Sequence, residues 1–148
     1  MDKNRKDPWV PEAGARQLMV SMYYPARRTT GRPAPYMTTE EARSLLQRKA
    51  PGADIPAETI SGTRTHAHTD ARPAGGRFPL VMLSPGLGLP RASLTFLAED
   101  LASRGYVVAL VDHTYESSGT TFPDGAHPPV PPSATSPGPP RAGRRPSP

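Results

Sequence analysis

One stretch decides the fold: Phe78-Pro-Leu-Val-Met-Leu-Ser-Pro-Gly-Leu-Gly-Leu-Pro90, which continues through a helical pattern to Gly105-Tyr-Val-Val-Ala-Leu-Val-Asp-His113. The apolar run from Leu80 to Ser84 lies between two prolines, which predicts a strand buried on both faces of a parallel sheet. Apolar residues at helical spacing predict a helix over Arg91 to Arg104, and Gly105 ends it. Tyr106 to Val111 is then the returning strand. The stretch predicts one βαβ unit with a right-handed crossover.

A further strand is predicted before this unit, over Arg16 to Pro25. The segment is rich in apolar and aromatic residues and ends at a proline, and Leu18, Val20 and Met22 fall on one face by their alternation.

The segment from about 29 to 76 is interpreted as an insertion or a lid-like element. Within it, Thr38 to Ala50 predicts a helix, because Thr38 and Glu41 have the spacing of a capping box and Pro51-Gly52 ends the run. Glu58 to Thr65 is expected to form a short strand, although Gly62 interrupts it.

The last residues, 126–148, differ from everything before them. They contain no leucine, isoleucine, aromatic residue or acid and are rich in proline and arginine. Such a segment buries too little apolar surface to offset its ordering entropy, so we expect a disordered tail. Residues 1–125 are expected to form the folded domain.

Charge and composition exclude several kinds of protein. The net charge of +5 includes three tail arginines, Arg141, Arg144 and Arg145, which leaves +2 for the remainder and no basic stripe for a nucleic acid. The absence of cysteine excludes disulfides and thiolate metal sites. No apolar run is long enough to span a bilayer, and no secretory leader is visible, so we expect a cytoplasmic protein.

The turn between the strand and the helix is the candidate functional element. Gly86 and Gly88 lack side chains, so a substrate atom can approach the backbone closely. In an open α/β sheet, ligands bind at the carboxyl ends of the strands, where helix N-termini present free N–H groups. We expect the backbone N–H of Leu87 to donate to a developing oxyanion, with Gly86 and Gly88 beside the substrate.

These residues resemble the amino-terminal part of an α/β-hydrolase, in the branch of platelet-activating factor acetylhydrolases and bacterial lipases. The resemblance rests on Ser84-Pro-Gly-Leu-Gly88, on the strand ending in Asp112-His113, and on the Ser-rich loop from Ser117 to Gly125. It implies hydrolysis of a carboxylic ester, with a short acyl group of a phospholipid as one substrate class, no cofactor, and His113 near the substrate. It covers about residues 16–125.

Two departures from this family pattern set the expectation for activity. Pro85 stands where the family usually has histidine, and the nucleophile elbow Gly-x-Ser-x-Gly occurs nowhere in the sequence. None of the catalytic Ser, Asp and His can be carried over, so we expect an amino-terminal fragment that is inactive alone.

Other polar residues are weaker candidates. The serines at 84, 93, 117 and 118 lack the context of a nucleophile elbow, and Asp112 more readily orients the following loop. His66, His68 and Asp70 have alternating spacing that suits a metal only on a strand, and a polar loop is the preferred interpretation.

Two alternative functions remain open from the sequence. Gly86-x-Gly88 after a strand, with Asp112 ending the next strand, also fits a dinucleotide-binding half, although Arg91 stands where a third glycine belongs. The prolines of 128–140 suit a ligand for a polyproline-binding partner, although the tail composition is also that of GC-rich DNA read out of frame. The preferred fold class is α/β, an incomplete α/β-hydrolase sheet.

Overall fold

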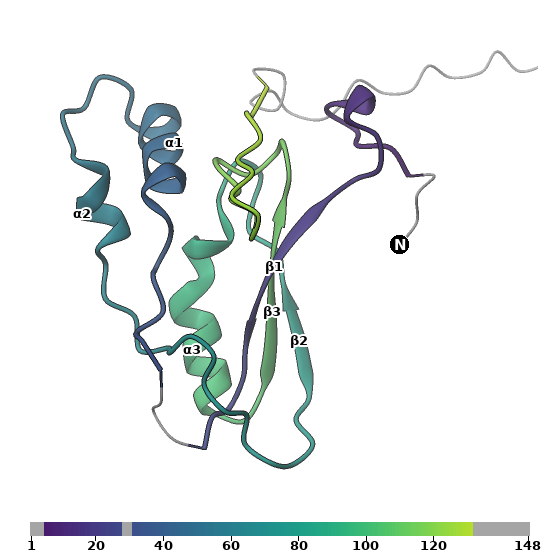
Figure 1. The fold of residues 1–148 in the computed structure, drawn as a ribbon, viewed down its shortest axis with the longest axis vertical. Helices are drawn as coiled ribbons and strands as arrows, with labels where there is room; N and C mark the ends of the chain where they lie inside the picture. Colours follow the sequence, from purple (N-terminus) through teal and green to yellow (C-terminus); the bar gives the residue numbers. More distant parts are fainter. Residues whose placement is uncertain (1–4, 28–30, 132–148) are drawn as a thin grey trace, which may run out of the picture.

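The structure is a computed structural model that describes residues 5–27 and 31–131 of the 148. Its centre is a sheet of β1 (Leu18–Tyr23), β3 (Val107–His113) and β2 (Leu80–Leu83), in the order β1-β3-β2. Strand β2 is parallel to β3, and β1 is antiparallel to it. Figure 1 shows that the helices α1 (Thr39–Lys49), α2 (Ala57–Ser61) and α3 (Thr95–Ser103) lie on one side of the sheet. The predicted α/β class and the βαβ unit are confirmed.

The crossover helix packs on β3 and forms the main core. Ala98 of α3 is fully buried against Val108 and Leu110, because the apolar residues of both elements fall on facing sides. A short 3-10 turn, η2 (Arg91–Leu94), precedes α3. Gly105, two residues after the end of α3, adopts φ +92°, the left-handed conformation expected of a glycine that ends a helix.

Helix α1 begins at the predicted capping box. The Thr38 side-chain oxygen accepts a hydrogen bond from the Glu41 N–H at 3.1 Å, and the Glu41 carboxylate accepts one from the Thr38 N–H at 3.0 Å. A second apolar cluster, separate from the sheet core, joins this helix to its neighbours through Met37, Ala42, Ala57 and Ala92.

We expect Thr38→Ala to destabilise the protein by about 1 kcal/mol, because it removes the acceptor for an otherwise unpaired helix N–H. Thr38→Ser keeps the oxygen and should stay within a few tenths of the original value. Urea denaturation followed by circular dichroism measures both; equal midpoints for the two variants would contradict the role of the cap.

The predicted strand over Glu58–Thr65 is wrong, because residues Ala57–Ser61 form helix α2. Pro56 fixes the start and Gly62 ends it, and the i, i+3 spacing places Ala57 and Ile60 against the same apolar cluster beneath α1. Packing against this cluster therefore selects a helix at this position.

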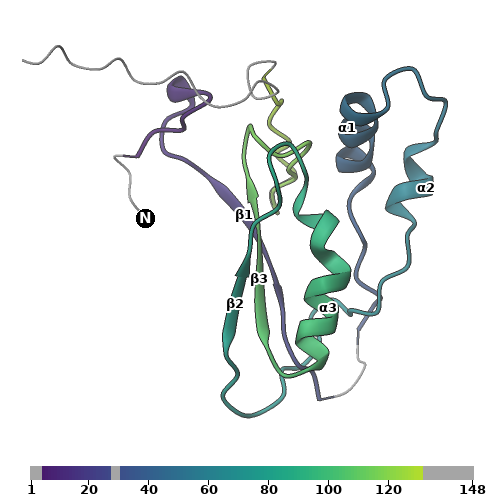
Figure 2. The same ribbon diagram turned by 180° about the vertical axis from the view of Figure 1, so that it is seen from behind.

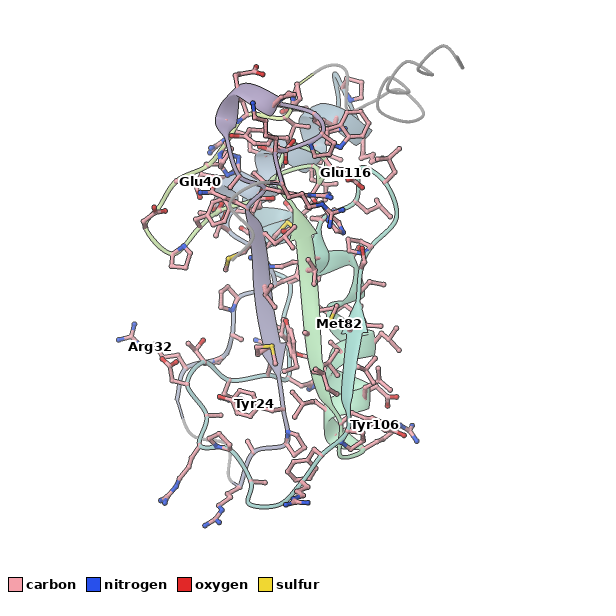
Figure 3. The ribbon with its side chains drawn as sticks, turned by 90° about the vertical axis from the view of Figure 1, so that its right-hand side faces the viewer. Tyr24, Arg32, Glu40, Met82, Tyr106 and Glu116 are labelled. Carbon is pink, nitrogen blue, oxygen red and sulfur yellow. The ribbon has the colours of Figure 1, made fainter. Side chains whose placement is uncertain are left out.

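One face of the sheet carries no covering element among the described residues. The strand register places five large apolar side chains on the face opposite α3, with exposed fractions of 42–71%: Leu18, Val20, Met22, Leu80 and Met82. Figure 3 looks onto this side, with the helices behind the sheet and Met82 labelled. The prediction that β2 is buried on both faces is wrong for this chain, because β2 lies at the edge of the described sheet and α3 covers only one of its faces.

The predicted disordered tail falls largely on residues 132–148, which lie outside the described residues. At its start, however, His127 is held by Ser44 of α1 and by Thr121, each at 3.0 Å from a ring nitrogen. The described part of the chain contains no helix with the length and apolarity that crossing a bilayer requires.

Candidate active site

The glycine turn lies where β2 ends, at the carboxyl end of the parallel strands and at the same end of the molecule as α1 (Figures 1 and 2). The N–H of Leu89 donates to the carbonyl of Gly86 at 3.0 Å and closes a four-residue turn. Gly88 has φ +73° in the third position, where a type II turn requires a residue that tolerates left-handed backbone. This conformation explains why the sequence has glycine at 88.

The turn leaves backbone donors unused. Within residues 5–27 and 31–131, neither the N–H of Leu87 nor that of Gly88 donates a hydrogen bond. Leu87 is 48% exposed, whereas Gly88 is buried. An oxygen atom of a ligand that reaches the Leu87 N–H can take its hydrogen bond without displacing a protein acceptor.

A buried ion pair fixes the far end of the turn. The N–H of Arg91 donates to Asp112 Oδ1 at 2.6 Å, and its guanidinium pairs with Asp112 Oδ2. Asp112 is fully buried, and burial raises the pKa of its carboxyl group, an effect that the charge of Arg91 opposes. Because both carboxylate oxygens are engaged by one residue, Asp112 anchors the turn to the end of β3.

Arg91 also connects the turn to the inserted segment. Its guanidinium donates to Glu41 at 3.1 Å and to Ser21 of β1 at 2.9 Å, and Glu41 also accepts the N–H of Thr121 at 3.0 Å. Burial alone would lower the pKa of Arg91, but the charges of Glu41 and Asp112 outweigh it and the pKa is raised. Arg91 is thus held as a cation between two buried carboxylates.

The loop after β3 supports the turn from the other side. Ser118 is fully buried and its hydroxyl donates to the carbonyl of Gly88. Gly119 lies tightly against α1, where an added Cβ would come within 3.0 Å of the Ser44 side chain. The Ser-rich loop that the sequence singled out is therefore a brace for the turn, packed between it and α1.

Ser84 and His113 form a pair that resembles a catalytic dyad, but the hydrogen bond between them runs in the opposite direction. Ser84 Oγ lies 2.8 Å from His113 Nε2, and Arg16 Nη2 lies 3.0 Å from His113 Nδ1. Arginine can only donate, so Nδ1 accepts, and the imidazole carries its proton on Nε2. Ser84 then accepts a hydrogen bond from His113, and the histidine cannot act as a base toward this hydroxyl.

His66, His68 and Asp70 lie in a loop that borders a cleft of about 1000 Å³ between β1, α3 and the inserted segment. The N–H groups of His66 and Ala67 donate to one oxygen of Glu99, at 2.9 and 2.8 Å. No group of three His, Asp or Glu side chains in the described part of the chain is arranged to hold a metal ion. The loop is thus tied to α3 through Glu99.

The fold brings the turn that contains residues 86–88 to the end of β3, where Ser84 contacts His113 and Arg91 contacts Asp112. The sequence named Glu41 only as a capping residue and Arg91 only as a departure from a glycine pattern. Their contacts at the site were missed, because they join positions 21 to 80 residues apart. The one available signal was an arginine at the start of a predicted helix, where a cation is unfavourable unless it is paired.

Comparison with known proteins gives consistent matches. The family model described as platelet-activating factor acetylhydrolase, isoform II, matches residues 9–131. Proteins named platelet-activating factor acetylhydrolase from Cavia porcellus and Bos taurus are each 40% identical over 48 residues, which are 32% of this chain and 11% of theirs. A solved structure of a ferulic acid esterase from Streptomyces cinnamoneus is 47% identical with a TM-score of 0.74, and the match covers 87% of this chain and 35% of that one. The chain thus spans about a third of the esterase and much less of the curated relatives.

Proposed function

Because the chain belongs to the family of platelet-activating factor acetylhydrolase, isoform II, we propose that it carries the oxyanion-binding part of a serine carboxylic-ester hydrolase. The resemblance to α/β-hydrolases expected from the sequence is confirmed by this membership and by the 47% identical esterase structure. The role of individual residues is the further step that the proposal takes.

The observation that carries the proposal is the pair of unused N–H groups at Leu87 and Gly88 in a braced turn. When a serine hydroxyl attacks an ester carbonyl, the carbonyl oxygen becomes negatively charged. A fixed N–H that meets this oxygen stabilises the transition state by roughly 3–4 kcal/mol. In the proposal Leu87 donates through its backbone, Gly86 and Gly88 admit the substrate, and His113 borders it.

The nucleophile in this proposal comes from polypeptide beyond the 148 residues, because they contain no Gly-x-Ser-x-Gly sequence. The free edge of β2 offers backbone groups for one more strand, and the uncovered face offers apolar surface for helices. Both features support a chain that is inactive alone and active when the rest of the sheet is present.

The proposed substrate class is a carboxylic ester. The relatives' names point to two kinds of ester, the acetyl ester of platelet-activating factor and an ester of ferulic acid. A short acyl ester of a phospholipid is the finer proposal that the family favours, and a ferulate ester is the alternative.

The test mixes this chain with the part of the Streptomyces cinnamoneus esterase that the match leaves uncovered. We expect neither polypeptide alone to hydrolyse p-nitrophenyl acetate, and the mixture to do so with saturation and with inactivation by a serine-directed phosphonate. Hydrolysis with saturation by this chain alone, above a heat-denatured control, would overturn the assignment of the nucleophile to the other polypeptide.

The uncovered face gives a second prediction for the same mixture. Met82 is 71% exposed at the edge strand, so we expect Met82→Lys to raise the soluble monomer fraction of the isolated chain and to weaken the complex about tenfold or more. Ile55, 44% exposed but on the loop between α1 and α2, supplies the matched control Ile55→Lys. Size-exclusion chromatography and calorimetry measure both effects; equal behaviour of the two variants would contradict docking at the sheet.

The dinucleotide-binding alternative lacks support in the geometry. Strand β1 runs antiparallel to β3, whereas the sheet of that fold is mostly parallel. Asp112 would have to bind a ribose, but both of its carboxylate oxygens are bonded to Arg91.

A further inference from the structure

The last turn of α1 brings two cations to the glycine turn. Arg48 Nη2 and Lys49 Nζ each lie 3.6 Å from the position that a Cβ on Gly88 would occupy. Gly88 itself is buried, and the inserted segment that carries α1 is held here by the ion pair between Glu41 and Arg91. The two positive charges therefore lie beside Gly88 in the turn.

Neither of these cations is neutralised within residues 5–27 and 31–131. The ion pairs there involve Arg16, Arg91 and Arg104, and none includes Arg48 or Lys49. Arg48 Nη1 is buried without a hydrogen-bond partner in the same residues. Since no carboxylate among the described residues pairs with either cation, both charges attract an anion that approaches the turn.

Favourable interaction with the helix dipole explains only part of this arrangement. Basic residues in the last turn of a helix are stabilised by the carbonyl groups there, and exposed side chains suffice for that effect. It does not require a guanidinium to lie over Gly88 with one nitrogen buried and unpaired. Arg91, four residues after Leu87, shows the contrast, because it pairs with two carboxylates.

We propose that Arg48 and Lys49, at Gly88, bind an anionic group, a phosphate or a carboxylate, that the ester substrate carries apart from its reacting carbonyl, which leaves the Leu87 N–H for the oxyanion. The identity of the ligand as a substrate rests on the proposed function. The binding of the anion does not, because it requires no hydrolysis. Planar guanidinium and compact ammonium groups together suit the several oxygens of such an anion.

The test titrates the full chain with inorganic phosphate, and separately with acetate, at constant ionic strength. Amide resonances of Leu87 and Gly88 in ¹H–¹⁵N spectra report binding. We expect saturable shifts at both amides, and a Kd for phosphate about tenfold higher in Arg48→Gln. Arg43→Gln is the matched control, because Arg43 is exposed on the same helix and its replacement removes the same charge. Its Kd should stay unchanged.

Arg48→Lys controls for a folding defect in Arg48→Gln, because lysine keeps the charge and the long stem. We expect Arg48→Lys to bind phosphate more tightly than Arg48→Gln. Equal weakening in Arg43→Gln and Arg48→Gln, or no saturable shift at Leu87 and Gly88 in the original chain, would overturn the proposal. Anion binding without esterase activity in the reconstituted mixture would contradict only the proposed function. Activity without anion binding would contradict only the assignment of Arg48 and Lys49.

Discussion

Replacing Leu87 with proline is expected to lower kcat of the reconstituted esterase by about 10²–10³-fold. Proline has no N–H, so the substitution removes the proposed donor to the oxyanion and leaves the rest of the chain unchanged. The effect should fall on kcat more than on KM, because the charge on the carbonyl oxygen exists only in the transition state and intermediate.

The turn tolerates this substitution, which makes the test sharp. Leu87 is the second residue of a turn closed by the bond from Leu89 N–H to the Gly86 carbonyl, and Gly88 has positive φ after it. Proline is common in that position of a type II turn. The N–H of Leu87 has no acceptor in the described residues, so no protein hydrogen bond is lost.

Leu87→Ala is the control, because it removes the half-exposed side chain and keeps the N–H. It should retain kcat within a few fold. Equal rates for Leu87→Pro and Leu87→Ala, in complexes shown to form with equal affinity, would refute the backbone role of Leu87.

Arg91→Met is expected to destabilise the isolated chain by about 3–5 kcal/mol. The guanidinium lies between Asp112, which is fully buried, and Glu41, which is 3% exposed, so its loss leaves two carboxylates without their cation in the interior. Methionine retains much of the apolar stem of arginine, so the lost stability reports the missing positive charge. Chemical denaturation followed by fluorescence of Trp9 and by circular dichroism measures the change.

The control for this prediction is another arginine–aspartate pair. Arg104 and Asp100 pair on the exposed surface of α3, with side chains 68% and 53% exposed. Solvent screens such a pair, so Arg104→Met should leave the denaturation midpoint nearly unchanged. If Arg91→Met proved as mild, the interior ion pair would not be what holds the turn to α1 and β3.

The sequence determined those elements whose signals are local. The period of the apolar residues defined β1, β2, β3 and α3, and the Thr38–Glu41 spacing defined the start of α1, because capping and periodicity depend on neighbours within a few positions. Glycine at 86 and 88 marked the turn for the same reason. The short helix at Ala57–Ser61 was mispredicted because it is stabilised by packing against Met37 and Ala42, which lie elsewhere in the chain.

Only the tertiary structure decided how the candidate site is held and charged. The contacts of Arg91 with Asp112 and Glu41, of Ser118 with Gly88, and of Arg48 with the turn join segments that no local pattern relates. Electrostatic and hydrogen-bonding partners are selected by distance in space, and the order of residues along the chain does not encode that distance. The residue types of the candidate turn were therefore visible in the sequence, whereas their partners and their burial came from the fold.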